Sequence, residues 1–360
     1  MRVHQIINDY SLSTGGAQRI VRNLHEYLPK KGVVSRIFGI SYHDDDDLEN
    51  AQSLSLGSPY QFRAIKKIYD YLSENVKPGD IIHAHLFPAI LYVSLLKMSG
   101  KLTNPIIFTE HSTSNRRRNN FLGSLIDRFT YTGCDKVVAI SEATENKLTK
   151  WKPKLKTKIV VINNGSHLHF KQFNDRPIKK RVRIVSVGRL TDAKNYSLAL
   201  EAVSELGAFD LEYWIAGDGQ LLHSLTALSQ KLGIENRVKF LGYVDNVSEL
   251  LAQADIFLIP SLWEGFGLAA VEAMNAGLPI IASDIPGLRE VVNSKVPCAE
   301  LINPKSKKSV SNGLKKLITS HQLRKKLGIN GFERAKVFSL DKMIDGYIKV
   351  YSEISDSEFN

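Results

Sequence analysis

The stretch Ser261–Glu272, which reads Ser-Leu-Trp-Glu-Gly-Phe-Gly-Leu-Ala-Ala-Val-Glu, places two carboxylates around a glycine turn. Glu264 lies in the turn, and Glu272 follows roughly two helical turns into a segment of strong helix formers. The first amides of a helix can hold a phosphate, while carboxylates accept hydrogen bonds from sugar hydroxyls. This combination suits a sugar nucleotide, although a glycosidase also needs two carboxylates.

Two cations follow an earlier strand of the same half of the chain. Arg189 and Lys194 come directly after the strand expected over 183–187, in the segment Val-Gly-Arg-Leu-Thr-Asp-Ala-Lys. Parallel sheets bind ligands beyond the carboxyl ends of their strands, so both side chains are placed to meet a phosphate. Two cations beside a diphosphate can stabilise a leaving group without a metal ion. Taken alone, a surface arginine and lysine is the simpler interpretation.

A glycine pair and a histidine are the candidates in the N-terminal half. Gly15 and Gly16 open a helical segment after the first expected strand, and the missing side chains let a ligand approach the backbone. The pattern is not Gly-x-Gly-x-x-Gly, which argues against a nicotinamide dinucleotide. His111 follows the strand expected over 105–110, where a ligand contact and a structural role are both open. His85 has the weaker claim, and we leave it outside the site.

Alternating strands and helices position these residues. In the first half, apolar runs predict strands over 2–7, 33–40, 80–85, 105–110, 136–140 and 158–162. In the second half, strands are expected over 183–187, 211–216, 238–241, 255–260, 278–282 and 299–302. Helices are expected there at about 195–206, 220–232, 247–253, 268–276 and 308–338. Such alternation predicts an α/β fold with parallel, doubly wound sheets.

A polar segment without periodicity, residues 166–180, separates the two alternating runs. We therefore expect a Rossmann-like N-terminal domain over 1–165, a linker over 166–180 and a second Rossmann-like domain over 181–338. Two such domains facing each other leave a cleft, and ligands usually bind at such places.

Composition excludes several classes of protein. The chain has 360 residues, 43% of them hydrophobic and 24% charged, which is ordinary for a globular protein long enough for two cores. Cys134 and Cys298 lack metal-type spacing and are expected to be free thiols. No apolar run approaches the roughly 20 residues of a membrane span, and the start does not suit a secretory signal. A cytoplasmic location is expected.

The net charge of +11 is concentrated in the first half. Residues 1–164 contain 23 Lys and Arg against 15 Asp and Glu, a balance that attracts a membrane surface, a phosphorylated substrate or nucleic acid. Basic and apolar residues are interleaved over 62–72, and Arg116, Arg117 and Arg118 precede apolar positions in 116–129. Either segment could rest on an anionic membrane. The alternative is an amphipathic helix that packs its apolar side on the sheet.

Four acidic residues stand together at Asp44–Asp47, after an expected strand. They could hold a divalent metal ion, but like charges in a row favour water, so a solvated loop is the preferred interpretation. We expect no metal site and no cofactor beyond a nucleotide-sugar co-substrate.

Together, Arg-x4-Lys after one strand and Glu-x7-Glu after a later one resemble the retaining, nucleotide-sugar-dependent glycosyltransferases of the GT-B fold, in particular family 4. The resemblance covers nearly the whole chain. It includes Gly-Gly-Ala-Gln-Arg at 15–19, Asp-Ile-Ile-His-Ala-His at 80–85, Thr-Glu-His at 109–111, Val-Ile-Asn-Asn-Gly at 161–165, Ala-Gly-Asp-Gly at 216–219 and Val-Lys-Phe-Leu-Gly-Tyr-Val at 238–244. Gln18 departs from it, because many members have Glu after Gly-Gly-Ala, which puts acceptor contacts in doubt.

The resemblance implies a role for each candidate in the second domain. Arg189 and Lys194 would hold the donor diphosphate, and Glu272 the ribose hydroxyls. Glu264 would hold the donor sugar as a catalytic group. The amides of Phe266, Gly267 and Leu268 would bind sugar and phosphate, and the backbone near Val244 would border the base.

The resemblance also assigns parts to the first domain. Gly16 would approach the diphosphate from the opposite side of the cleft, and His111 would be the catalytic residue beside the transferring sugar. A last helix, about 339–354, would pack back onto this domain.

The expected activity is transfer of a sugar, with retention, from a nucleotide donor to a hydroxyl of a glycan or lipid-linked acceptor. UDP is the expected nucleotide, and synthesis of cell-envelope polysaccharide or glycolipid the expected setting, at the inner face of the membrane. A sugar-nucleotide 2-epimerase of the same fold is the alternative. A nucleic-acid binder is disfavoured, because interleaved surface aromatics and a recognisable binding module are missing.

Overall fold

The computed structural model describes the chain except for residues 12–14, 42–47, 169, 171, 294 and 358–360, so the acidic run Asp44–Asp47 lies outside the described residues. The chain forms two compact units. The first comprises Met1–Asn164 together with Leu340–Asn360, and the second comprises Gly165–Ser339. Each has its own parallel sheet and its own hydrophobic core.

The first unit is built on a seven-stranded parallel sheet with the strand order β3-β2-β1-β4-β5-β6-β7. The strands are β1 (Arg2–Ile7), β2 (Val34–Ser41), β3 (Ala51–Leu56), β4 (Ile81–His85), β5 (Ile106–Glu110), β6 (Lys136–Ala139) and β7 (Ile159–Val161). Every residue of β4 and β5 is buried, as expected for central strands covered on both faces. The direction of winding reverses between β1 and β4, so this pair forms the switch point of the sheet.

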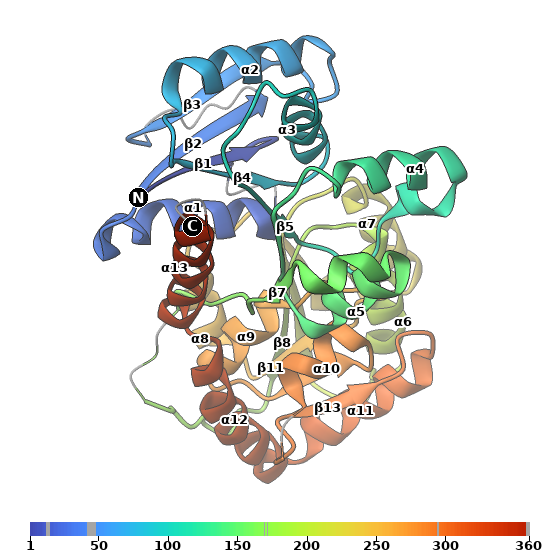
Figure 1. Cartoon of the computed structure of the whole chain (residues 1–360). Coiled ribbons are helices and arrows are strands. Elements are labelled where there is room, and N and C mark those ends of the chain that lie inside the picture. The colour runs from blue at the N-terminus through green and yellow to red at the C-terminus, as the bar shows by residue number, and fades with distance from the viewer. Residues whose placement is uncertain (12–14, 42–47, 169, 171, 294, 358–360) are drawn as a thin grey trace. The chain divides into compact units, whose positions relative to one another are not determined.

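Helices cover both faces of this sheet (Figure 1). They are α1 (Gly16–Tyr27), α2 (Arg63–Asn75), α3 (Ala89–Met98), α4 (Phe121–Thr130), α5 (Glu142–Trp151) and α13 (Leu340–Ser357). Successive side chains of β1 point to opposite faces. Ile6 therefore packs with the residues of α2 and α3, whereas Ile7 packs with Val21 of α1.

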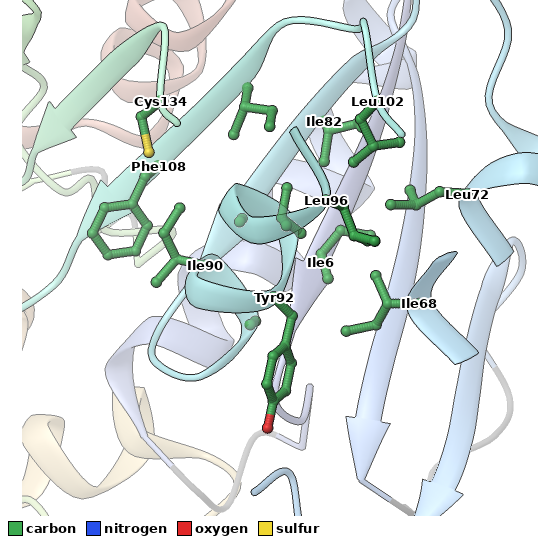
Figure 2. Close-up of a cluster of buried hydrophobic side chains, with 14 of the residues drawn as sticks. Ile6, Ile68, Leu72, Ile82, Ile90, Tyr92, Leu96, Leu102, Phe108 and Cys134 are labelled. Atoms are coloured by element: carbon green, nitrogen blue, oxygen red, sulfur yellow. The ribbon is translucent and has the colours of Figure 1, made fainter. Parts of the chain in front are cut away.

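Figure 2 shows the larger core cluster of this unit. Ile68 and Leu72 lie one turn apart on α2 and face the cluster, as the helical spacing of the apolar residues predicts. Each such buried side chain stabilises the fold by roughly 1.5–3 kcal/mol. Cys134 borders the cluster, and burial raises the pKa of its thiol to about 12. Cys134 and Cys298 are both buried thiols, and neither is in a disulfide, as expected.

Helix α13 is the last element of the chain but belongs to the first unit. Its Tyr347 and Tyr351 are fully buried. The Tyr351 hydroxyl lies 2.8 Å from His83 Nδ1, and the Tyr347 hydroxyl lies 3.2 Å from Thr109 Oγ1. The helix thereby supplies hydrogen-bond partners for two buried polar side chains of β4 and β5.

The second unit has a six-stranded parallel sheet with the order β10-β9-β8-β11-β12-β13. The strands are β8 (Val182–Val187), β9 (Leu211–Ala216), β10 (Val238–Gly242), β11 (Ile256–Ile259), β12 (Ile280–Ser283) and β13 (Ala299–Ile302). The helices are α6 (Tyr196–Ser204), α7 (Leu222–Lys231), α8 (Val247–Gln253), α9 (Leu268–Asn275), α10 (Pro286–Val292), α11 (Lys307–Thr319) and α12 (His321–Ala335). Its switch point lies between the neighbouring strands β8 and β11.

Three elements differ from the sequence prediction. Strand β3 was not expected, because Gln52, Ser53 and Ser55 leave it without an apolar run, and it lies at the sheet edge, where little apolar surface is needed. The helix predicted over 308–338 is two helices, α11 and α12, because the Ser320 side chain caps α12 by accepting from the Leu323 amide. Helix α10 was also missed. It is short and begins at Pro286, a residue that sequence reasoning treats as a helix breaker but that is favourable at a first helical position.

The described residues of 166–180, expected as a linker, form no regular helix or strand. They nevertheless pack on the second unit. The Arg176 guanidinium donates to the carbonyl oxygens of Ala252 and Ala276, and Phe173 contacts Phe332 edge to face. The segment therefore forms part of the surface of that unit.

Candidate functional site

The loops that follow β8 and β11 carry the candidate residues of the second unit. These strands are neighbours, so their carboxyl ends meet at one edge of the sheet. The two loops are also bonded to each other. The Leu262 amide donates to the Ala193 carbonyl oxygen at 2.8 Å, and Asn195 Nδ2 donates to the Pro260 carbonyl oxygen at 3.1 Å. Asn195 adopts the left-handed backbone conformation, with φ 56°.

Lys194 and Glu264 form an ion pair across these two loops. Lys194 Nζ donates to Glu264 Oε1 at 2.6 Å, and the Ser261 hydroxyl donates to the same oxygen at 2.8 Å. The side chains are 22% and 12% exposed, so the pair is screened less than a surface pair. The cation and the carboxylate predicted from separate motifs thus meet.

Arg189 and Glu272 differ from this pair in their exposure. The Arg189 side chain is exposed, and its guanidinium makes no hydrogen bond or ion pair with another described residue. Glu272 is 1% exposed and lies within α9. Arg189 is thus a solvated cation in the loop after β8, and Glu272 is a buried carboxylate in α9, the helix that follows the loop after β11.

The glycine turn before α9 has the geometry that its sequence predicts. Gly267 caps the helix in the left-handed conformation, with φ 92° and ψ 51°, so that Leu268 is the first helical residue. Phe266 is buried against Phe338, with ring centroids 5.3 Å apart. A buried aromatic on one side of Gly267 and a helix on the other fix the direction of the first amides of α9.

The backbone of helix α10 closely approaches the backbone of this turn. A Cβ atom placed on Gly287 would lie 2.4 Å from the Glu264 carbonyl oxygen. Only glycine fits at this distance. Gly287 was not singled out in the sequence, and no local pattern marks it, because its neighbour across the contact is distant in the chain.

Val244 follows β10, two residues beyond the end of that strand, and is half-buried. The strand lies at the sheet edge, next to β9, and the Gly217 amide donates to the Gly242 carbonyl oxygen. Val244 is thus separated from β8 by one strand, on the same carboxyl edge as the other candidates.

In the first unit, Gly16 begins α1 and Asn8 joins the two strands of the switch point. Asn8 Nδ2 donates to the Phe87 carbonyl oxygen at 2.8 Å, which ties the loop after β1 to the loop after β4.

A Cβ atom on Gly16 would meet no described atom within 4 Å. Gln18 donates to the carboxylate of Asp9, a contact that the usual Glu could not make.

His111 is part of a row of histidines in the first unit. His111 Nε2 lies 3.1 Å from His85 Nδ1, and the His83 and His85 rings lie 4.0 Å apart. Burial lowers the pKa of His111 to about 3 and holds the pKa values of His83 and His85 well below their ordinary range. All three are therefore neutral at physiological pH. His85, which we had left outside the site, contacts His111 directly.

Arg117 and Arg118 do not have the surroundings expected for a membrane-binding cluster. Arg118 is mostly buried and bonds to Asp127 at 2.9 Å and to Glu110 at 3.0 Å. Arg117 pairs with Asp127 at 3.1 Å. These contacts tie the loop after β5, which begins at His111, to helix α4. Arg117 and Arg118 are occupied by carboxylates, because buried acidic groups require paired charges.

Helix α4 also contradicts the alternative interpretation, in which its apolar residues pack on the sheet. Its buried residues are Asp127 and Thr130. The apolar residues are exposed instead: Phe121 85%, Leu122 66%, Phe129 50% and Leu125 39%. In contrast, α2 buries Ala64, Ile68, Tyr71 and Leu72, as the amphipathic reading of 62–72 predicts.

Two further features of the described residues concern metal ions and membranes. Within them, no three His, Cys, Asp or Glu side chains are grouped so that they could hold a metal ion. In the same residues, no helix has the length and apolar character needed to cross a membrane.

Several residues whose side chains contact the candidates were not singled out from the sequence. Gln5 lies 2.8 Å from His85, and Ser261 bonds to Glu264. A signal did exist for the histidines. His83 pairs with Ile107 and His85 with Thr109 across the sheet, so residues 83, 85, 109 and 111 at alternate positions share one face. Polar residues at alternate positions of fully buried strands could have identified this cluster.

Two doubly wound parallel sheets, each with candidate residues at its switch point, define the GT-B class of α/β proteins. Residues 169–334 match the family described as Glycosyl transferases group 1, and residues 14–170 match Glycosyltransferase Family 4. The chain belongs to these group 1 glycosyltransferases of the GT-B fold, as the sequence predicted. The sugar-nucleotide epimerase alternative is not favoured.

Relatives and solved structures match along the whole chain. An uncharacterized glycosyltransferase of Methanocaldococcus jannaschii is 29% identical, over 95% of each chain. N-acetylgalactosamine-N,N'-diacetylbacillosaminyl-diphospho-undecaprenol 4-alpha-N-acetylgalactosaminyltransferase of Campylobacter jejuni is 26% identical, over 94% of this chain and 97% of the relative. The structure of Anabaena HepE in complex with UDP and glucose superposes with a TM-score of 0.83 at 19% identity, covering 98% of this chain and 100% of the other.

Proposed function

We propose that this glycosyltransferase moves a sugar, with retention of configuration, from a UDP-sugar to a hydroxyl of a lipid-linked or glycan acceptor. The observation that carries the donor side is the set of charges at the β8–β11 switch point: exposed Arg189, the Lys194–Glu264 pair and buried Glu272. The solved structure of HepE with UDP and glucose supports the choice of nucleotide.

Each charge has a part in holding the donor. Arg189 and Lys194 bind the diphosphate, and their charge stabilises the negative charge that grows on the leaving phosphate. Glu264 fixes Lys194 through their ion pair and accepts a hydrogen bond from the donor sugar. Glu272 accepts hydrogen bonds from the ribose hydroxyls, and the backbone at Val244 borders the base.

The backbone supplies the remaining donor contacts. The amides at the start of α9, from Phe266 to Leu268, bind a phosphate or sugar oxygen in this proposal, because the first amides of a helix lack intrahelical partners. Gly16, with open space around its Cα, allows the diphosphate to approach the start of α1. His111 contacts the transferring sugar.

The reaction proposed is a front-face displacement. The acceptor hydroxyl attacks the anomeric carbon on the side that the nucleoside diphosphate leaves, and the departing phosphate oxygen takes the hydroxyl proton. The bond that forms joins the acceptor oxygen to the anomeric carbon, and the bond that breaks joins that carbon to the phosphate oxygen. No metal ion is required, because Arg189 and Lys194 supply the positive charge.

A donor screen tests the nucleotide. Thermal denaturation is followed with UDP-, GDP- and ADP-sugars, and turnover is then measured on the donor that stabilises most. We expect a UDP-sugar to raise the melting temperature and to release UDP in the presence of EDTA. Stabilisation by GDP- or ADP-sugars alone would refute the choice of UDP. An inverted anomeric configuration of the product, read by proton NMR, would refute retention.

An anionic membrane is the proposed location of the acceptor. The name of the Campylobacter relative includes a diphospho-undecaprenol carrier. In this chain, α4 exposes Phe121, Leu122, Leu125 and Phe129 beside the exposed Arg128, and the first half of the chain carries the excess of positive charge. Apolar side chains can enter the lipid boundary while the basic field attracts anionic headgroups.

Sedimentation with vesicles tests this location. The double variant Phe121→Ser, Leu122→Ser should bind vesicles of phosphatidylglycerol and phosphatidylcholine several-fold more weakly than the parent chain, because it loses the exposed apolar area. Ile178→Ser is the matched control, since Ile178 is an isolated apolar residue of the second unit with 77% exposure. Equal sedimentation of the double variant and the parent would remove the membrane from the proposal.

A further inference from the structure

Three side chains form a continuous hydrogen-bonded row in the first unit. Gln5 lies on β1, His85 ends β4 and His111 follows β5. Gln5 Oε1 lies 2.8 Å from His85 Nε2, and His85 Nδ1 lies 3.1 Å from His111 Nε2. Gln5 and His85 are fully buried, whereas His111 is half-buried. The row therefore runs from the inside of the sheet to its carboxyl edge.

With Gln5 Oε1, rather than Nε2, facing His85, the chemistry of the three groups sets where the protons lie. An amide oxygen only accepts, so His85 Nε2 must carry the hydrogen and donate to Gln5. A neutral imidazole has one N–H, so His85 Nδ1 is the acceptor. His111 Nε2 must then carry the hydrogen that His85 Nδ1 receives. This leaves the lone pair of His111 on Nδ1, which makes no hydrogen bond with any described residue.

We propose that Gln5 and His85 are positioning residues that hold His111 as the neutral Nε2–H tautomer, with Nδ1 presented as an acceptor to a hydroxyl of the donor sugar. The inference rests on the proposed function, because it assumes that His111 contacts the transferring sugar. It adds the ligand chemistry: a lone pair attracts a hydroxyl hydrogen and repels a phosphate oxygen. His111 thereby selects the sugar part of the donor and leaves the phosphates to the cations.

His83 serves as the internal comparison. Its ring lies 4.0 Å from the His85 ring at a tilt of 41°, but its nitrogens lie 2.8 Å from the Tyr351 hydroxyl and 2.8 Å from Thr109 Oγ1, and both of these partners are buried. It has no bond to the Gln5–His85–His111 row. His83 thus has the contacts of a structural histidine, whereas His85 bonds to the half-buried His111 and thereby sets its orientation.

Nitrogen NMR of the full chain, labelled with ¹⁵N histidine, tests the tautomer directly. In the parent chain, His111 should show a protonated Nε2 and an unprotonated Nδ1. Gln5→Leu removes the acceptor of His85, so His111 should show both tautomers. Turnover of the UDP-sugar should fall about tenfold in kcat/KM, while the affinity for UDP, which lacks the sugar, should stay unchanged.

Paired variants of His85 separate an effect on the orientation of His111 from an effect on the stability of the fold. His85→Asn can place an amide oxygen near the position of Nδ1 and should restore most of the turnover, whereas His85→Leu should not. Tyr347→Phe is the control, since it removes a hydroxyl from the same buried region, 3.2 Å from Thr109 Oγ1, but leaves the row intact. It should keep both the tautomer and the turnover of the parent chain.

Three results would overturn the inference: an Nδ1–H tautomer of His111 in the parent chain, an unchanged tautomer in Gln5→Leu, or a mixed tautomer with unchanged turnover. Failure of the proposed function looks different. If no nucleotide sugar is turned over by the parent chain, that function is refuted, while the spectra of the parent and of Gln5→Leu still decide the tautomer.

Discussion

The two switch points of this glycosyltransferase are built from opposite kinds of chemistry. Between β8 and β11 the second unit places charged groups, with Lys194 paired to Glu264 at 2.6 Å and Arg189 exposed. Between β1 and β4 the first unit places neutral groups, an amide from Gln5 and an imidazole from His85. Burial holds that imidazole uncharged by lowering its pKa.

The difference matches what each region is proposed to bind. A diphosphate needs fixed positive charge, and that charge is most effective where water is partly excluded. A sugar presents hydroxyls, which are recognised by neutral donors and acceptors of defined direction. The neutral Gln5–His85 pair offers a phosphate no positive charge, whereas the loops after β8 and β11 carry the cations Arg189 and Lys194.

Removing the charge from the second unit should have the largest effect. Arg189→Ala with Lys194→Ala should lower turnover roughly a thousandfold or more, because the leaving phosphate loses both stabilising cations. Measurement of kcat with the donor selected by the screen checks this. Lys239→Ala is the control, since Lys239 is 57% exposed and only 3.7 Å from Glu212.

Lys194→Ala alone also leaves Glu264 without its lysine partner, so the single variant Arg189→Ala isolates the effect on phosphate. Its guanidinium has no described partner to disturb. Normal turnover in the double variant would contradict the proposed difference between the two switch points, because the charges of the second unit would then not be needed for the reaction.

A change of shape without a change of charge should have the next largest effect. Gly287→Ala pushes a methyl group to within 2.4 Å of the Glu264 carbonyl oxygen, so the turn must move. We expect kcat/KM to fall roughly a hundredfold, as for other small displacements of catalytic groups. Gly207→Ala is the control, because its Cβ would meet nothing within 4 Å. Equal activity of the two variants would show that the turn tolerates displacement.

The smallest expected effect is on stability: lowering the pH should destabilise the first unit more than the second. Burial lowers the pKa values of five histidines of the first unit below the ordinary value. Between the folded pKa and the unfolded value of about 6.5, the unfolded state binds more protons. The free energy of unfolding of this unit therefore falls as pH drops below about 6.5.

Hydrogen–deuterium exchange followed by mass spectrometry checks this, after correction for the intrinsic pH dependence of exchange. Peptides from residues 1–164 should lose protection between pH 7.5 and 5.5, and peptides from 165–339 should lose less. A larger loss in the second unit would contradict the assignment of neutral histidines to the first.

Much of this arrangement could be predicted from the sequence. The fully buried strand β11 reads as a continuous apolar run, and the motif at 264–272 follows it, while the motif at 189–194 follows the mostly buried strand β8. Because carboxyl ends of parallel strands share one edge, the meeting of Lys194 and Glu264 followed from topology. Family membership followed from the same motifs.

The remaining contacts depend on residues that are distant in sequence. Gly287 matters because it touches Glu264, and nothing near Gly287 in the chain signals that contact. Helix α4 does not pack its apolar side on the sheet, because the pattern of apolar residues does not reveal that Asp127 is the buried side chain, paired with two arginines. Long-range charge pairing outweighed the local amphipathic pattern.

The return of α13 to the first unit has a consequence for synthesis on the ribosome. Residues 165–339 can complete their sheet as soon as they emerge, whereas the first unit must wait for Leu340–Ser357. Until then Thr109 and His83 lack the hydroxyls of Tyr347 and Tyr351. Domains usually mature in order from the N-terminus. Here the order is reversed, so the half that starts first is finished last.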